Sequence, residues 1–239
     1  MPRRSSSIIL LLPVLVLLAA CSKETGQTDG PAVVTPPSAE ALVEPLLVLD
    51  TTAQALNVTY RPTGVRFQLF EDETFEESEE GTFHRLLSSF GAYVSYSKEW
   101  YYEGGAHPSY GQSYHAVTVG ETLAEADLRD LFPEHALYAA LQQTPLVQHT
   151  ALDHATLDEL LDGLATTYAC EMSFERFFSS FFVKQVQDDI AEVVVGLTHG
   201  CEVQRGNFTT LILKMDVSQE KKAVFEDLQL FHDQTERVP

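Results

Sequence analysis

Basic residues are scarce in this 239-residue sequence. Lys and Arg number 15 against 35 Asp and Glu, which gives a formal net charge of −20. A surface this acidic repels nucleic acid and anionic lipid, and it attracts basic proteins, polyamines or divalent cations. The acidity also fits a plain role in solubility. We therefore expect no nucleic-acid partner, and we regard solubility as the simpler explanation of the acidity, with a basic envelope protein as the alternative.

Motifs of the common enzyme classes are missing. The sequence has no His-Glu-x-x-His pair of zinc ligands, no Gly-x-Ser-x-Gly turn for a nucleophilic serine and no Gly-x-x-x-x-Gly-Lys loop for phosphate. His149 and His154 would diverge by about 140° on a helix, so they make a poor metal pair. Carboxylates are too abundant for their presence to indicate glycosidase chemistry. We predict a non-enzymatic protein with no metal and no cofactor.

The only long hydrophobic run lies at the N-terminus. Two arginines precede it, and it covers residues 8–20, which is too short to span a bilayer as a stable helix. It ends in the sequence Leu18-Ala19-Ala20-Cys21, which resembles a bacterial lipobox. We predict that residues 1–20 are a signal peptide and that Cys21 is lipidated, for example with palmitate. Such an anchor attaches a protein to a membrane without crossing it.

The residues after Cys21 favour a tether followed by one domain. Residues 21–39 are small, polar and proline-rich, so they cannot bury enough apolar surface to fold. Ser22 follows the cysteine, as in enterobacterial outer-membrane sorting signals, so we expect attachment at the periplasmic face of the outer membrane. The remaining residues, 40–239, have the length of a single domain with a sizeable core.

Strand-like segments stand on both sides of a central helical stretch. We expect helices over 134–143, after Pro133, and over 153–167. Strands are expected over 43–49, 65–70, 90–102, 112–119, 190–197, 208–215 and 224–231. The phenylalanines between 174 and 182 fit either a buried helix face or a helix end followed by a strand near Phe181. The pattern predicts an α+β domain with an antiparallel or mixed sheet packed against a few helices.

An acidic tract covers residues 71–80, where seven of ten side chains are Asp or Glu. Adjacent carboxylates repel one another, so this tract favours an exposed loop. A calcium site is the sharper alternative, but the tract lacks the Asp-x-Asp-x-Asp-Gly spacing that wraps oxygen ligands round the ion.

Two cysteines remain once Cys21 is lipidated. Cys170 and Cys201 would most simply form a disulfide in an oxidising envelope. The alternatives are free thiols or a metal site with His199, the only histidine nearby.

The segments 90–102 and 112–119 predict a β-hairpin with a glycine-rich loop. Paired glycines allow positive φ, and Pro108 ends the ladder. One interpretation makes the loop a binding site, because aromatic faces suit sugars or protein hot spots. In the other, the glycines shape the turn, His107 bonds the backbone and the tyrosines fill the sheet. The candidate ligand-binding residues are Tyr101, Tyr102, Gly104, Gly105, His107 and Tyr110.

The same hairpin carries a family resemblance over about residues 60–133. An aromatic strand, the run Gly104-Gly105-Ala106-His107-Pro108, a tyrosine-bearing return strand and a Leu-x-x-Leu-Phe segment ending at Phe132 follow one another. This arrangement resembles the extracytoplasmic domain of unknown function in lysozyme-sensing anti-sigma factors of Gram-positive bacteria, found also beside some peptidoglycan deacetylases. The family usually has Asn where Ser109 stands. The resemblance implies direct binding of lysozyme.

Three hypotheses for function follow. The first is a non-catalytic envelope lipoprotein that binds lysozyme, another basic envelope protein or peptidoglycan through the hairpin loop. The second is a peptidoglycan hydrolase that uses His107 and a nearby Glu103 as acid and base. The third is a structural partner of an envelope complex.

Overall fold

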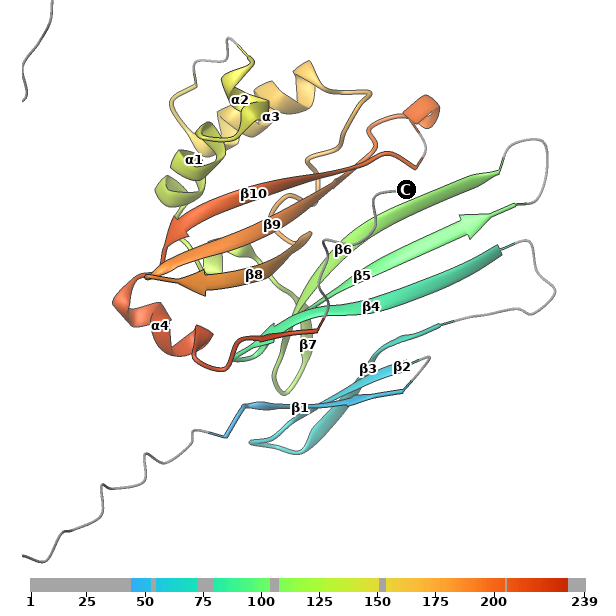
Figure 1. The fold of residues 1–239 in the computed structure, drawn as a ribbon, viewed down its shortest axis with the longest axis vertical. Coiled ribbons are helices and arrows are strands. Elements are labelled where there is room, and N and C mark those ends of the chain that lie inside the picture. Colours follow the sequence, from blue (N-terminus) through green and yellow to red (C-terminus); the bar gives the residue numbers. More distant parts are fainter. Residues whose placement is uncertain are drawn as a thin grey trace, which may run out of the picture. The chain divides into compact units, whose positions relative to one another are not determined.

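The computed structural model describes residues 44–52, 55–72, 80–103, 108–150, 154–204 and 206–231, which form three antiparallel sheets and four helices (Figure 1). The strands are β1 (Leu47–Thr51), β2 (Ala55–Tyr60), β3 (Val65–Glu71), β4 (Glu80–Phe90), β5 (Tyr93–Tyr102), β6 (Ser109–Val119), β7 (Leu123–Glu125), β8 (Phe181–Gln187), β9 (Ile190–Thr198), β10 (Phe208–Asp216) and β11 (Gln229–Leu230). The helices are α1 (Glu134–Gln142), α2 (Pro145–Gln148), α3 (Leu157–Thr167) and α4 (Gln219–Phe225). The α+β class is as predicted.

Several predicted features lie outside the described residues. They are the signal peptide, Cys21, the tether, most of the acidic tract, and the loop residues Gly104, Gly105 and His107. All the described elements belong to one compact unit, Val43–Pro239. None of the described helices has the length and hydrophobicity that crossing a membrane requires.

The largest sheet has the strand order β11-β4-β5-β6-β7. β5 and β6 pair from Tyr93↔Thr118 to Tyr102↔Ser109, which confirms the predicted hairpin. The single strand expected over 90–102 is wrong at its start, because Phe90 ends β4 and the chain turns before β5. Gly91 makes this turn with φ +50, and its N–H donates to the Asp227 carboxylate at 2.6 Å.

The two faces of this sheet pack against different partners. One face meets the sheet β1-β2-β3 through Leu56, Val58, Leu86 and Val94. The other meets β8 and β9 through a smaller cluster, Leu87, Tyr114, Phe182 and Val194. Side chains along a strand alternate between faces, so β4 contributes Leu86 and Leu87 to different clusters, and β6 likewise contributes Val119 and Tyr114.

The main core lies around the sheet β10-β9-β8 and the helices that pack on it. α1 contacts β10, and α3 contacts α1, so these helices cover one face of that sheet (Figure 1). The helix expected over 153–167 is confirmed over Leu157–Thr167, and its four leucines are buried. Fully buried members of this core include Phe90, Leu137, Leu141, Leu160, Leu164, Phe177, Phe181, Val193 and Leu213.

A segment of turns, residues 174–180, joins α3 to β8 and links the two larger sheets. Ser179 accepts from the Ala116 N–H at 3.0 Å, and Ser180 accepts from the Gly196 N–H at 2.8 Å. The helical interpretation of the phenylalanines here is therefore wrong, whereas the strand expected to begin near Phe181 is confirmed. Within the segment only turn bonds form, such as that from the Ser180 N–H to the Arg176 carbonyl at 2.8 Å, and the carbonyls of Ser179 and Ser180 accept from neighbouring strands.

Some strands of the structure differ from those predicted from the sequence. The strands β2 and β4 were not predicted, and the strand expected over 224–231 is instead the end of α4 followed by the short β11.

Cys170 and Cys201 form the predicted disulfide, with 4.7 Å between their Cα atoms, so they are neither free thiols nor metal ligands. The bridge ties the chain just after α3 to the loop between β9 and β10.

Candidate functional site

A groove of about 440 Å³ lies between the five-stranded sheet and the sheet β10-β9-β8. One wall comes from β4, β5 and β6, and the other comes from β8, β9 and β10. The lining residues are Arg85, Glu99, Gln112 and Tyr114 on the first wall and Phe182, Lys184, Val194, Phe208, Thr210 and Ile212 on the second.

Strand register places the first wall on a single face. Phe83 pairs with Glu99, and Glu99 pairs in turn with Gln112, so these three side chains stand side by side across β4, β5 and β6. Residues two apart along a strand share a face, which adds Arg85 and Tyr114 to the same row. On the second wall, Ile212 is 49% exposed. The groove therefore has an apolar surface that the fold itself does not cover.

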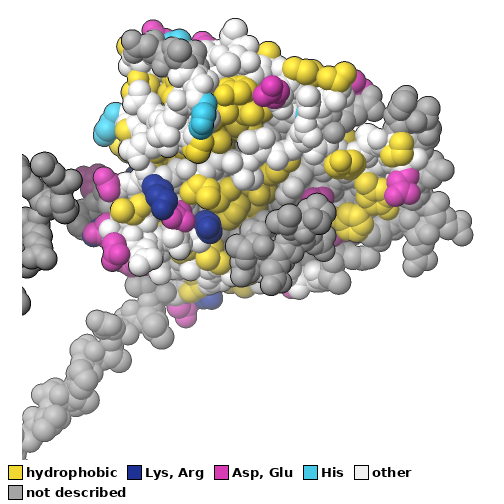
Figure 2. All heavy atoms as spheres, turned by 45° about the horizontal axis from the view of Figure 1, so that its top comes forward, with side chains coloured by type: hydrophobic (Ala, Val, Ile, Leu, Met, Phe, Trp, Pro, Cys, Tyr) yellow, Lys and Arg dark blue, Asp and Glu magenta, His cyan; other side chains and the backbone are white. Residues whose placement is uncertain are grey.

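The groove continues into an aromatic pocket of about 300 Å³ at the ends of β4–β6, and Glu99 and Gln112 line both parts. Phe83 and Tyr101 stack there with their ring centroids 5.8 Å apart. Tyr110 also lines the pocket, and it is 64% exposed. Figure 2 shows hydrophobic side chains gathered on the right of the view, toward these strand ends, with an acidic side chain among them. We call groove and pocket together the sheet groove.

Two glycines make room for the tyrosine rings. A Cβ on Gly81 would lie 2.4 Å from the ring of Tyr101, its cross-strand partner, and a Cβ on Gly206 would lie 2.5 Å from the ring of Tyr110. Gly206 also has φ +80, a conformation that other residues adopt only with strain. A side chain at either position would displace the tyrosine ring that lies against the backbone there.

The charges of the sheet groove are mixed in sign. Arg85 and Glu99 approach to 3.5 Å, while Lys184 and Lys214 both reach Glu192 beside the second wall, at 3.8 and 2.8 Å. Burial raises the pKa of the neighbouring Tyr114 hydroxyl to about 12, so it remains a neutral hydrogen-bonding group. The sheet groove thus offers aromatic faces together with paired polar groups.

The structure places only some of the predicted site residues in this groove. Tyr101 and Tyr110 line it, whereas Tyr102 follows Tyr101 in β5 and its side chain belongs to the opposite face. Phe83, Glu99 and Phe208 were missed. The alternation of Phe83 and Arg85 on one face was the available signal, but it is readable only once β4 is recognised as a strand.

A second polar cluster, on the other face of β5 and β6, places a serine beside a histidine. Ser113 Oγ lies 2.9 Å from His115 Nε2, and the Arg176 guanidinium lies 3.3 Å from His115 Nδ1. A guanidinium only donates, so Nδ1 accepts and Nε2 carries the proton. The imidazole therefore donates to Ser113 and cannot take its proton, which is the reverse of what an activated serine requires.

A third polar cluster, around His84, has a structural role. Asp72 accepts from both the backbone N–H and Nδ1 of His84, each at 2.8 Å, and the ring of Phe70 stacks on His84 with 4.7 Å between centroids. Both side chains of this contact are nearly buried. The contact fastens the end of β3 to the beginning of β4.

Metal binding and comparison with known proteins add no further assignment. Within the part of the chain that the structure describes, no three His, Cys, Asp or Glu side chains are gathered so that they could hold a metal ion. Comparisons of the chain with protein-family models, with curated proteins and with solved structures give no match. Function is therefore inferred from the sheet groove and from the sequence motifs.

Proposed function

We propose that this chain is a non-catalytic lipoprotein of the bacterial cell envelope that binds a lysozyme-type hydrolase in the sheet groove. In this proposal residues 1–20 are removed, Cys21 is lipidated and residues 21–39 act as a tether at the periplasmic face of the outer membrane. The observation that carries the binding role is the exposed aromatic end of the groove, formed by Phe83, Tyr101 and Tyr110.

Exposed aromatic side chains on rigid strands are typical of binding hot spots. They supply large contact areas at a small entropic cost, because few torsions are lost on binding. Tyr110 is pressed against Gly206, and Tyr101 is stacked on Phe83, so both rings are held in place before a ligand arrives. Such preorganisation lowers the cost of association.

Charge and resemblance both support a lysozyme-type partner. The chain has a formal net charge of −20, which speeds its encounter with a strongly cationic hydrolase. The hairpin at the end of the groove carries the Gly-Gly-Ala-His-Pro run of the lysozyme-sensing domain, with Tyr101 before it and Tyr110 after it.

The chemistry of the groove favours binding over hydrolysis. Glycoside hydrolysis generally uses two carboxyl groups on either side of the scissile bond. Among the described lining residues of the sheet groove, Glu99 is the one carboxylate, and Arg85 is paired with it.

Calorimetric titration of fragment 40–239 with a lysozyme, at low and at moderate salt, tests this function. We expect saturable binding at moderate salt and a loss of at least about tenfold in affinity for Tyr110→Ala. Tyr102→Ala is the matched control, because it removes an exposed tyrosine from the end of β5 on the opposite face; its affinity should change by less than about twofold. Heat that vanishes at moderate salt, or equal losses in the two variants, would refute the proposal.

A further inference from the structure

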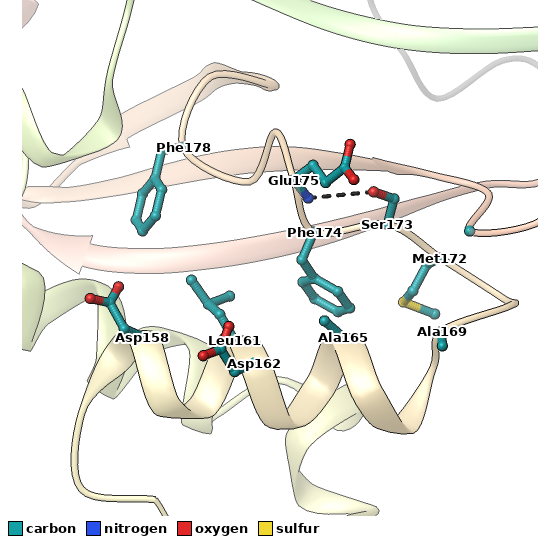
Figure 3. A pocket seen from close by; sticks show the side chains of 11 residues that line it. Asp158, Leu161, Asp162, Ala165, Ala169, Met172, Ser173, Phe174, Glu175 and Phe178 are labelled. Carbon is teal, nitrogen blue, oxygen red and sulfur yellow. Dashed lines mark hydrogen bonds between the residues drawn. The ribbon is translucent and has the colours of Figure 1, made fainter.

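A second groove, of about 600 Å³, lies between α3 and the segment 172–178 that follows the disulfide. Figure 3 shows the side chains of α3 on one side and those of the segment on the other, with Phe174 directed at Ala165. We call it the helix groove. It shares no lining residue with the sheet groove, so an argument about it does not depend on the function proposed above.

The floor of the helix groove is apolar. It is lined by Leu161, Ala165, Met172, Phe174 and Phe178. Leu161, Met172 and Phe174 are each 8% exposed, so the floor is fixed by the core beneath it. An apolar surface in a concavity of this size suits one or two hydrophobic side chains of a ligand.

The rim of the helix groove is acidic. Asp158 and Asp162 lie one turn apart on α3, and Glu175 stands on the opposite side. All three side chains are exposed, and none of their carboxylates has an ion-pair partner among the described residues. The nearby Arg129 is already paired with Asp127 at 2.5 Å, and its guanidinium lies 4.3 Å from the centre of the Phe178 ring. Arg129 also attracts Asp158 electrostatically, though without an ion pair. The rim therefore presents negative charge that no ion pair among the described residues neutralises.

The walls of this groove are held firmly. The disulfide fastens the chain after α3 to the loop that carries Gly200, where an added Cβ would lie 2.2 Å from the carbonyl oxygen of Ala169. At the same end of the groove, the Ser173 N–H donates to the carbonyl of Thr198 at 2.7 Å. A groove fixed in this way needs little rearrangement to accept a ligand.

We infer that the helix groove binds a basic amphipathic segment of a partner protein, with a hydrophobic anchor on the floor and flanking Lys or Arg side chains on the rim. Charge complementarity selects this occupant. A second copy of this chain would bring another acidic surface to the rim, and anionic lipid or nucleic acid would meet the same repulsion. A polyamine would satisfy the rim, yet it would leave the apolar floor without a comparable partner.

The test uses a short synthetic peptide in which Leu and Phe anchors alternate with Lys, and an analogue with Glu in place of Lys. Fragment 40–239 is suitable, because it holds every core cluster described above, and its cooperative unfolding is checked first. Affinity is measured by fluorescence anisotropy at moderate salt. Amide hydrogen exchange then locates the contact, and we expect slower exchange in α3 and in residues 172–178.

Two variants and one control separate a specific site from diffuse attraction. Ala165→Trp fills the floor, and Asp162→Lys reverses one rim charge at an exposed position; each should weaken binding of the Lys peptide at least about tenfold. Asp216→Lys makes the same charge change at an exposed position on β10 and should cost less than about twofold. The Glu analogue should not bind.

Two results would overturn the inference. Equal losses for Asp162→Lys and Asp216→Lys, with no effect of Ala165→Trp, would mean that net charge alone attracts the peptide. Displacement of the peptide by spermine at equal concentration of positive charge would mean that the groove takes small cations and that the apolar floor is irrelevant.

Discussion

His115 lies among groups that oppose its protonation. Burial, followed by the nearby charges of Arg176 and Lys98, lowers the pKa of this imidazole to about 4 from an ordinary value of 6.5. Its ring also stacks on Tyr96, with 5.1 Å between centroids. The Arg176 guanidinium is held in place by Glu125 at 2.6 Å, so the charge facing the imidazole persists over the pH range in which His115 would titrate.

The lowered pKa makes stability depend on pH with a defined sign. The unfolded chain takes up a proton at His115 near pH 6.5 and the folded chain only near pH 4, so the contribution of His115 to stability is lost as the pH falls through this window. His115→Gln should therefore reduce the drop in unfolding free energy between about pH 7.5 and about pH 4.5. Urea denaturation at the two pH values measures this drop in unfolding free energy. His135→Gln, at an exposed position, is the control. An unchanged drop in His115→Gln would contradict this account of the cluster.

The residue types at the site were easier to predict from the sequence than the face of the sheet on which each side chain lies. The sequence shows a cluster of tyrosines near paired glycines, and Tyr101 and Tyr110 do line the sheet groove. It cannot show that Tyr102 faces away until the register of β5 is known, because one position along a strand changes the face. Gly206 was also not predictable, because it reaches Tyr110 only through the folding of a loop far along the chain.

At the scale of elements, the beginning of α3 is defined by reciprocal hydrogen bonds. Thr156 Oγ1 accepts from the Glu159 N–H at 3.2 Å, and the Glu159 carboxylate accepts from the Ala155 N–H at 3.0 Å. This arrangement satisfies the Glu159 N–H, which the first turn leaves without an intrahelical partner, and the N–H of the residue just before the cap. It also fixes the end of α3 from which Asp158 projects into the helix groove.

Removing this cap should destabilise the domain. Thr156→Ala is expected to lower the unfolding free energy by about 1 kcal/mol. Thr166→Ala is the matched control. The Thr166 hydroxyl donates to the carbonyl of Asp162 on the same exposed face of α3, so it does not cap the helix. Alanine is also the better helix former. This variant should leave stability nearly unchanged or raise it slightly. Guanidinium denaturation of both variants provides the comparison, and equal effects would argue against the capping role.

Elements with a clear period were predicted, and those defined by tertiary contacts were not. α1 begins after Pro133 as expected, and β9 and β10 appear as apolar runs of the right length. The phenylalanines of 174–180 have helical spacing, yet the carbonyls of Phe178 and Ser179 bond to other parts of the chain. β4 begins inside the acidic tract and contains a bulge between Leu86 and Ser88, which breaks the alternation that would identify it.

At the scale of the whole molecule, the disulfide connects the two proposed binding sites. Cys170 follows α3 and the helix groove, and Cys201 begins the loop that leads to Gly206 under Tyr110. Both grooves therefore depend on one cross-link between distant parts of the chain.

Loss of the bridge should lower stability and weaken both sites. The cysteines are 31 residues apart, and closing a loop of that length stabilises the folded state by about 3 to 4 kcal/mol. The double variant Cys170→Ser and Cys201→Ser should show this loss in chemical denaturation, and the wild-type chain with reductant should reproduce it. If reduction changed neither stability nor affinity for lysozyme, the bridge would have no part in shaping the grooves.

The central claim, that the sheet groove is the surface that binds a lysozyme-type hydrolase, is tested most directly by amide hydrogen exchange of fragment 40–239 with and without lysozyme. The account predicts slower exchange at the end of β5, the beginning of β6 and the beginning of β10, with α3 unchanged. Slower exchange confined to other strands or to α3, or no change under conditions in which the two proteins associate, would contradict it.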